Sequence, residues 1–384
     1  MDDISLSGLT AVNPVPLADP RADGAPLREE ILAAAARVLD RGWYVLGTEV
    51  ACFEQRMAER LGVPGTVGVG SGTDALVLAL LAAGVGAGDE VITVSHTAGP
   101  TVAAIRMIGA TPVLIDVEAD TYCLDPAMLE GAAGSRTKAI IAVHLYGHPA
   151  PLGVIAALAA RHGIAVIEDC AQAQDAAIDG RTVGAIGHFG CFSFYPTKNL
   201  GAIGDGGLVS ARDVKNVERL RQLRTYGWTR PQFAEIPNGR CSRLDELQAA
   251  ILSVKLDHLD RQVERRRALA RLYTEAFAAL PIVCPIERSG CHHVYCLYVI
   301  RSRERDALAQ HLERAGIMTG LHYPFPVHEQ PALAAAARIP GPLAVTDWLA
   351  REILTLPLYP SMPAAYQTRV VDAVRAFFAS SRAA

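Results

Sequence analysis

Lysine is scarce in this chain of 384 residues, which has four lysines against 32 arginines. Genome composition rather than function explains such an imbalance, but it makes each lysine worth inspecting. Lys198 stands between an aromatic run and a glycine cluster, in FSFYPTKNLGAIGDGG (192–207). Three interpretations of it are open at this point: a surface charge, an ammonium that holds a phosphate, or an amine that bonds covalently to a carbonyl.

The sequence also lacks the segments that export a protein or anchor it in a membrane. Its opening, MDDISLSGLTAVNPVPL, has neither a basic start nor a continuous apolar core, so we expect no signal peptide. The richest apolar run, ALVLALLAAGVGA (75–87), is too short for a spanning helix and is broken by Gly84 and Gly86. A net charge of −4 gives no reason to expect nucleic acid or a membrane as a partner. We therefore predict a soluble cytoplasmic protein.

No CxxC pair occurs among the eight cysteines, and we expect all of them to be reduced thiols. CHHVYC (291–296) has the residue types of a metal site. However, HHVYCLYVI (292–300) alternates like a strand, which sends neighbouring side chains to opposite faces. We therefore predict no metal site.

Between residues 66 and 225, β-branched runs alternate with Ala/Leu-rich stretches of helical character. Strands such as DEVITVS (89–95) and IAVIEDCA (164–171) are apolar on both faces, which is typical of parallel strands covered by helices. We therefore predict an α/β fold with a mostly parallel sheet. Ligands of such sheets bind beyond the carboxyl ends of the strands, so the residues after each strand are the first candidates for a site.

A long helical stretch (244–280) ends at Pro281 and precedes a different pattern. We predict a large α/β domain with an N-terminal arm over 1–250 and a small α+β domain over 251–384. The elements expected in the second domain are a strand in HHVYCLYVI, a helix in RERDALAQHLERAG (303–316), a strand-like IMTGLHYP (317–324) and closing helices.

The stretch VGVGSGTDALVLAL (67–80) contains a glycine-rich turn and a helix that begins near Thr73. Small residues such as Gly72 let a ligand approach the backbone, and the free amides of a helix N-terminus attract an anion. The pattern fits neither a P-loop nor GxGxxG. A phosphate site and a plain tight turn both remain open.

Glu168 and Asp169 end the strand in IAVIEDCAQAQ. Acids at such a position either cap the next helix or balance a buried cation. Asp169 is the candidate for the second role, in which a carboxylate would hold the proton on a pyridine nitrogen and make the ring a better electron sink.

Ser193 and Lys198 lie close together in CFSFYPTKN. A hydroxyl can donate to a phosphate while an amine five residues later reaches an aldehyde of the same cofactor. Burial favours the neutral, nucleophilic form of an amine, as bond formation with a carbonyl requires. Lys198 and Asp169 together therefore suggest pyridoxal 5′-phosphate (PLP).

Several motifs, in order, resemble the DegT/DnrJ/EryC1/StrS family of PLP-dependent aminotransferases over residues 27–375. The resemblance implies the aspartate-aminotransferase fold (fold type I) for the large domain and a homodimer whose active site lies at the subunit interface. The motifs are GSGTDALVLAL, AVHLYGHPAPL, VIEDCAQA, FSFYPTKNLGAIGDGG, SRLDELQAAIL, HYPFPVHEQPA and LPLYP.

The resemblance assigns a role to each cofactor residue. Lys198 would be the Schiff-base lysine and proton shuttle, Asp169 would bind the pyridine nitrogen, and Gln172 would lie against the ring or its 3-hydroxyl. Ser193 and the backbone of Gly72 and Thr73 would hold the phosphate.

The segment HYPFPVH (322–328) is similar to one that contacts the sugar-nucleotide end of the family's site. His322 and Tyr323 are therefore candidate substrate contacts, and the alternative is that they only pack the domain junction.

The family's usual reaction moves an amino group, here expected from glutamate, to a nucleotide-linked keto sugar. A cyclitol or other keto precursor is an alternative substrate, and a non-catalytic regulator is an alternative function. The family's sugar dehydratases have histidine in place of the lysine, and Lys198 argues against them.

Two positions depart from the family pattern. Ala98, in SHTAG, stands where an aromatic residue usually stacks on the cofactor. Cys241, in CSRLDE, stands where an asparagine usually reaches the phosphate of the neighbouring subunit. Ring stacking and the cross-subunit contact are therefore in doubt, whereas the lysine–aspartate pair is untouched.

Overall fold

The structure is a computed structural model that describes residues 13–381. Most of the opening stretch, for which we expect no signal peptide, lies outside this range. Across residues 13–381, every helix is too short or too polar for a bilayer span.

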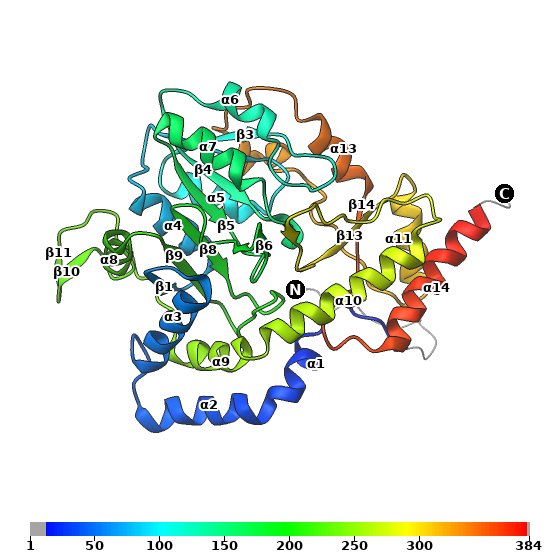
Figure 1. The fold of residues 1–384 in the computed structure, drawn as a ribbon, viewed down its shortest axis with the longest axis horizontal. Coiled ribbons are helices and arrows are strands. Elements are labelled where there is room, and N and C mark those ends of the chain that lie inside the picture. Colours follow the sequence, from blue (N-terminus) through cyan, green and yellow to red (C-terminus); the bar gives the residue numbers. More distant parts are fainter. Residues whose placement is uncertain (1–12, 382–384) are drawn as a thin grey trace.

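A seven-stranded sheet forms the centre of the larger part of the molecule (Figure 1). One strand, β9, is antiparallel to both of its neighbours, and the other six run in one direction. The mostly parallel sheet predicted from the two-sided apolar strands is thereby confirmed. In sheet order the strands are β1 (Gly65–Val69), β9 (Gly207–Ala211), β8 (Phe189–Ser193), β5 (Ala165–Asp169), β4 (Thr137–Val143), β2 (Glu90–Val94) and β3 (Thr111–Ile115).

Helices cover this sheet, and the most buried of them is α4 (Gly72–Ala82). Its residues from Ala75 to Leu81 are all buried and apolar, because the helix packs against strands β8 and β9 on one side and against helix α5 on another. The other helices of this part are α2 (Arg28–Arg41), α3 (Thr48–Leu61), α5 (Gly99–Met107), α6 (Leu129–Ala132), α7 (Leu152–His162), α8 (Val214–Leu223) and α9 (Glu246–Leu256).

The helical stretch at 244–280 is two helices, because the chain breaks between α9 and α10 (Leu259–Phe277) at Asp257 and His258. In Figure 1, α10 runs away from the central sheet toward α14 (Ala364–Ser381). A separate hydrophobic cluster, which includes Tyr273, Tyr298 and Val374, forms around them. The other elements here are β13 (Tyr298–Arg301), β14 (Ile353–Leu356) and α11 (Arg305–Arg314), whereas α13 (Ala344–Glu352) packs on the core around the central sheet.

Two predicted strands are wrong. HHVYCLYVI is not one strand: its start belongs to β12 (Cys291–His292), which pairs with β6 (Ala177–Ile178), and its end belongs to β13, which pairs with β14. Between them Tyr295 takes a left-handed conformation, with φ of 44°, and donates its N–H to Nδ1 of His293 over 3.0 Å. This local bond competes with strand pairing.

IMTGLHYP forms no strand either, and it makes only two isolated bridges within the described residues, from Ile317 to Val15 and from Gly320 to Thr355 of β14. The partner of β13 is instead β14. Short elements complete the described chain: α1 (Pro20–Gly24), β7 (Arg181–Thr182), β10 (Trp228–Arg230), β11 (Phe233–Ala234) and α12 (Pro331–Ala334).

Candidate active site

The carboxyl ends of the parallel strands bring the predicted residues together. Lys198 follows β8, Asp169 ends β5, and Thr97, Ala98 and Thr101 follow β2. All five line one small cavity of about 30 Å³, and Gln172 and Tyr323 also line it. The rule that ligands bind beyond strand ends therefore locates the same place as the motifs do.

Asp169 is 6% exposed and held by two donors. The Thr101 hydroxyl donates to its Oδ2 over 2.9 Å, and the backbone N–H of Ala171 donates to Oδ1 over 3.1 Å. Because Thr101 gives its proton to the carboxylate, Thr97, 3.0 Å from Thr101, must donate to Thr101. The side chains of Thr97 and Thr101 were not among the predicted site residues, although their position after β2 could have identified them.

Burial raises the pKa of Asp169, and the two hydrogen bonds and the charge of Lys198 only partly oppose that effect. The carboxylate is thus short of positive charge in this structure. A protonated ring nitrogen beside it would supply that charge, so Asp169 fits the role predicted for it.

Glu168, the neighbouring acid, faces a different environment. Its carboxylate accepts hydrogen bonds from the backbone N–H groups of Gly184, Ile186 and Gly187, over 2.6–2.8 Å. His144 completes the set, with Nε2 3.1 Å from Glu168 Oε2. Glu168 therefore holds a loop in place, and of the two acids only Asp169 faces the cavity.

Ser193 lies against the N-terminus of α4. A Cβ added to Gly72 would be 2.6 Å from the Cβ of Ser193, so only glycine lets the two segments approach this closely. The amides of Gly72 and Thr73 precede the first internal hydrogen bonds of α4, whose N-cap is Ser71. Two helix amides and a hydroxyl thus converge where the sequence predicts a phosphate, and the residues fit that group.

Lys198 lines a second cavity of about 260 Å³ as well as the first. Its backbone N–H donates to the carbonyl of Tyr195 over 2.9 Å, which closes the turn after β8. Lys198 is half-buried, lines both cavities and lies close enough for its charge to act on Asp169, which favours a role in the site over a surface charge.

Gln172, His322 and Tyr323 also line the second cavity. The amide of Gln172 is fixed at both ends: Oε1 accepts the N–H of Tyr146 over 2.7 Å, and Nε2 donates to the Tyr323 hydroxyl over 3.0 Å. His322 Nδ1 lies 2.8 Å from the hydroxyl of Thr355. His322 and Tyr323 thus line the cavity next to Lys198 and are held by hydrogen bonds, and their contact with a substrate stays a prediction.

Tyr146 connects these residues and was not predicted. Its hydroxyl donates to the carbonyl oxygen of His322, so His96, with Nε2 2.9 Å away, must donate to Tyr146. Nδ1 of His96 is then an acceptor, and it is buried without a partner in the described part of the chain. The sequence signal was available, because Tyr146 closely follows the end of β4, at the same edge of the sheet where Asp169 ends β5.

These histidines predict a loss of stability in mild acid. Burial lowers the pKa of His96 to about 4, and burial together with the charge of Lys198 lowers the pKa of His322 to about 4. In the unfolded chain both histidines take up protons near pH 6.5, whereas in the folded protein they stay neutral down to about pH 4. The free energy of unfolding should therefore fall as the pH drops from 6.5 toward 4. The slope should approach about 1.4 kcal/mol per pH unit for each histidine.

Urea unfolding of the cofactor-free protein between pH 7 and pH 5 measures this slope. His96→Asn and His322→Asn should each lower this slope by up to about 1.4 kcal/mol per pH unit, and His148, His188 and His293, whose pKa values burial also lowers, account for the remainder. A free energy of unfolding that does not change between pH 6.5 and pH 5 would contradict the prediction.

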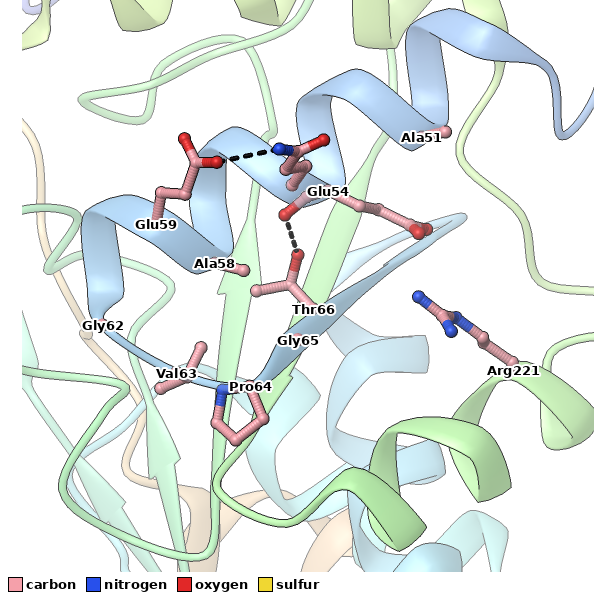
Figure 2. Close-up of a pocket in the computed structure, with 11 residues that line it drawn as sticks. Ala51, Glu54, Ala58, Glu59, Gly62, Val63, Pro64, Gly65, Thr66 and Arg221 are labelled. Carbon is pink, nitrogen blue, oxygen red and sulfur yellow. Dashed lines mark hydrogen bonds between the residues drawn. The ribbon is translucent and has the colours of Figure 1, made fainter.

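A larger cavity, of about 500 Å³, lies elsewhere, between α3, the start of β1 and Arg221 of α8 (Figure 2). Its polar groups bond to one another: Gln55 donates to Glu59 over 2.9 Å, and Thr66 donates to the carbonyl of Glu54 over 2.7 Å. It contains none of the predicted site residues, so volume alone does not make it the active site.

Cys241 lies outside both cavities around Lys198, and of the CHHVYC stretch only Cys296 lines one of them, the second. The exposed Cys241 accepts a hydrogen bond from Arg243, with 2.7 Å between Nη2 and Sγ. Over residues 13–381, two groups of side chains are close enough to share a metal ion, and neither includes a residue of CHHVYC. One of these groups consists of His144, Glu168 and Cys170. The carboxylate of Glu168 already accepts hydrogen bonds from the loop at 184–187. The predicted absence of a metal remains a prediction.

Comparison with known proteins identifies the family. The sequence profile described as the DegT/DnrJ/EryC1/StrS aminotransferase family matches residues 26–375. A dTDP-3-amino-3,4,6-trideoxy-alpha-D-glucose transaminase from Streptomyces venezuelae is 46% identical over 362 residues, which cover 94% of this chain and 95% of that protein.

Two crystal structures show the same fold. DesV from S. venezuelae, in complex with a ketimine intermediate, has a TM-score of 0.92 and 45% identity, and the match covers 95% of this chain and 99% of DesV. NtdA from Bacillus subtilis, with bound cofactor PMP, has a TM-score of 0.88 and 29% identity over 97% of this chain and 86% of NtdA. Both the predicted fold type I architecture and the resemblance noted in the sequence are confirmed: the chain is an aminotransferase and belongs to the DegT/DnrJ/EryC1/StrS family.

Proposed function

We propose that this enzyme uses PLP to move an amino group from an amino acid, with glutamate as the expected donor, to a nucleotide-linked keto sugar. The observation that carries the proposal is the meeting of Lys198 and Asp169 in one cavity. The sugar transaminase from S. venezuelae, similar over nearly its whole length, supports the substrate class.

Six residues would hold the cofactor. The backbone of Gly72 and Thr73 and the hydroxyl of Ser193 would hold its phosphate, Asp169 would bind its ring nitrogen, Gln172 would lie against the ring or its 3-hydroxyl, and Lys198 would bond to its aldehyde. When bound, PLP supplies a carbonyl that condenses with amines and a ring that accepts electrons from the adjacent carbon.

Lys198 is then the group that moves protons. Its Nζ would accept the proton that leaves the α-carbon of the donor and pass it to the C4′ carbon of the cofactor, and in the second half of the cycle it would move a proton from C4′ to the former carbonyl carbon of the keto sugar. Asp169 would keep a proton on the ring nitrogen of the cofactor. His322 and Tyr323 form the wall of the second cavity, where they would contact the sugar substrate.

We also propose a homodimer whose active site lies at the subunit interface. Tyr195, which lines the second cavity, is 53% exposed, and Ile203, on the same loop after β8, is 57% exposed. Large apolar side chains at the rim of a site are typical of a surface that a partner covers. The division into domains at residues 250 and 251, and the cytoplasmic location, stay predictions of the same kind.

The proposed function is tested with a panel of keto substrates. Purified protein reconstituted with PLP is mixed with glutamate and with dTDP-, UDP- and GDP-linked keto sugars, and amino sugar formation is measured by mass spectrometry. A keto cyclitol in the same panel tests the alternative substrate. We expect turnover with at least one nucleotide-linked sugar. A protein that takes up no PLP would contradict the enzymatic proposal and leave the regulatory alternative.

A further inference from the structure

Arg266 is a cation that the fold buries without a matching carboxylate. It lies on α10 and is 4% exposed. In the described part of the chain, no ion pair involves this guanidinium within 4.0 Å. Arg224, which is buried to a similar extent, is paired with Glu54. An unpaired charge in the interior is costly, so the solitary guanidinium of Arg266 needs an explanation.

Two backbone carbonyls orient this guanidinium. Nη1 donates to the carbonyl of Leu358 over 3.0 Å and to that of Cys296 over 3.4 Å. Nε is buried and has no hydrogen-bond partner within residues 13–381. Burial lowers the pKa of Arg266, and the more distant Asp23 and Cys296 only partly oppose that effect. The guanidinium is thus aimed and held, yet not neutralised.

The position of Arg266 links it to the chemistry, because it lines the same cavity of about 260 Å³ as Lys198, His322 and Tyr323. None of the described residues that line this cavity is an aspartate or a glutamate. Leu297, Leu356 and Leu358 form apolar walls, which keep the local dielectric low and strengthen attraction to an anion. The cavity is therefore built to accept negative charge close to Lys198.

We propose that Arg266 binds a carboxylate of the amino-acid donor. This inference rests on the proposed function, in which Lys198 acts at the α-carbon of that donor. The α-carboxylate is attached to the same carbon, so it must lie in a space that Lys198 also reaches. A guanidinium can bind a carboxylate through two parallel hydrogen bonds, which would use the donors that Arg266 has left.

A diphosphate is the other anion that the reaction brings to the site. A cavity of about 260 Å³ is below the range of about 300–1,000 Å³ that drug-sized ligands occupy, so a nucleotide-linked sugar could place only its sugar end there. The structure therefore favours the small amino acid as the ligand of Arg266. The test separates the two anions directly.

The experiment compares substitutions of two neighbouring arginines of α10, made separately in the PLP-loaded enzyme. Arg266→Met removes the proposed contact, and Arg265→Met removes a charge from the adjacent, exposed residue outside this cavity. Calorimetric titration with glutarate, an unreactive dicarboxylate, measures carboxylate binding, and titration with dTDP measures diphosphate binding. We expect Arg266→Met to weaken glutarate binding and raise the KM for glutamate about 10- to 100-fold, with dTDP binding unchanged. Arg265→Met should behave as the wild type.

Arg266→Lys covers the case in which the methionine variant does not fold. It keeps the charge but loses the planar fork, so it should weaken glutarate binding less than methionine does and still measurably. Unchanged glutarate binding in Arg266→Lys together with an unchanged glutamate KM would overturn the inference, as would a loss confined to dTDP. Failure of the proposed function looks different, because the wild type itself would then transfer no amino group.

Discussion

Replacing Lys198 with alanine is expected to lower the rate of amino transfer by at least about 10⁴-fold. The amine has two roles in the proposed reaction, as the nucleophile toward a carbonyl and as the base and acid that moves protons, and proton transfer alone contributes up to about 10⁴-fold. No neighbouring side chain can replace it. His322, which shares its cavity, has a pKa lowered to about 4 by burial and by the charge of Lys198, so it is a poor base near neutral pH.

Two measurements check this expectation. Purified wild-type protein loaded with PLP should be yellow, with an absorbance band that shifts when glutamate is added, and Lys198→Ala should lose that band. Lys198→Arg keeps the positive charge without a usable amine and should be as inactive as alanine. Lys215→Ala, which changes an exposed lysine on α8, is the matched control and should retain full activity. Activity of Lys198→Ala within 10-fold of the wild type would contradict the role.

The placement of Lys198 and Asp169 could be predicted because Asp169 ends one parallel strand and Lys198 comes soon after the end of another strand of the same sheet. Periodicity identifies such strands, and their carboxyl ends must lie at one edge, so residues 29 positions apart in the chain can be expected to meet there. The same rule could have found Thr101 and Tyr146. It cannot say which of two adjacent acids faces the cavity, which depends on the loop that Glu168 holds.

Arg266 shows what the sequence alone does not specify. It is the middle one of three consecutive arginines, which a helix directs to three different sides about 100° apart. Arg265 is exposed, Arg266 is buried, and Arg267 binds Glu287. The position of α10 against the rest of the molecule decides which of the three lies in the cavity, and that position depends on packing between distant segments.

Replacing Asp169 with asparagine is the second change with a large expected effect, a loss of amino transfer of about 100- to 1,000-fold. Asparagine preserves the shape and can still accept a hydrogen bond from Thr101. It lacks the negative charge that would keep a proton on a ring nitrogen, so the electron-accepting power of the ring would fall. The apolar interior magnifies that loss, since Asp169 is buried and water cannot replace its charge.

A spectroscopic measurement separates this electrostatic role from a structural one. Without the carboxylate, the ring nitrogen should lose its proton at a lower pH, so the pH titration of the bound cofactor's absorbance should shift toward acid in Asp169→Asn. Thr101→Val is the matched control: it removes the hydroxyl that donates to Asp169 Oδ2 but keeps the carboxylate, and it should cost far less activity and shift the titration little. Equal losses of activity in the two variants, with no shift in either titration, would mean that Asp169 has only a structural role, through its hydrogen bonds with Thr101 and Ala171. Because burial already raises the pKa of this carboxyl, a cation beside it is the arrangement that lets Asp169 stay charged.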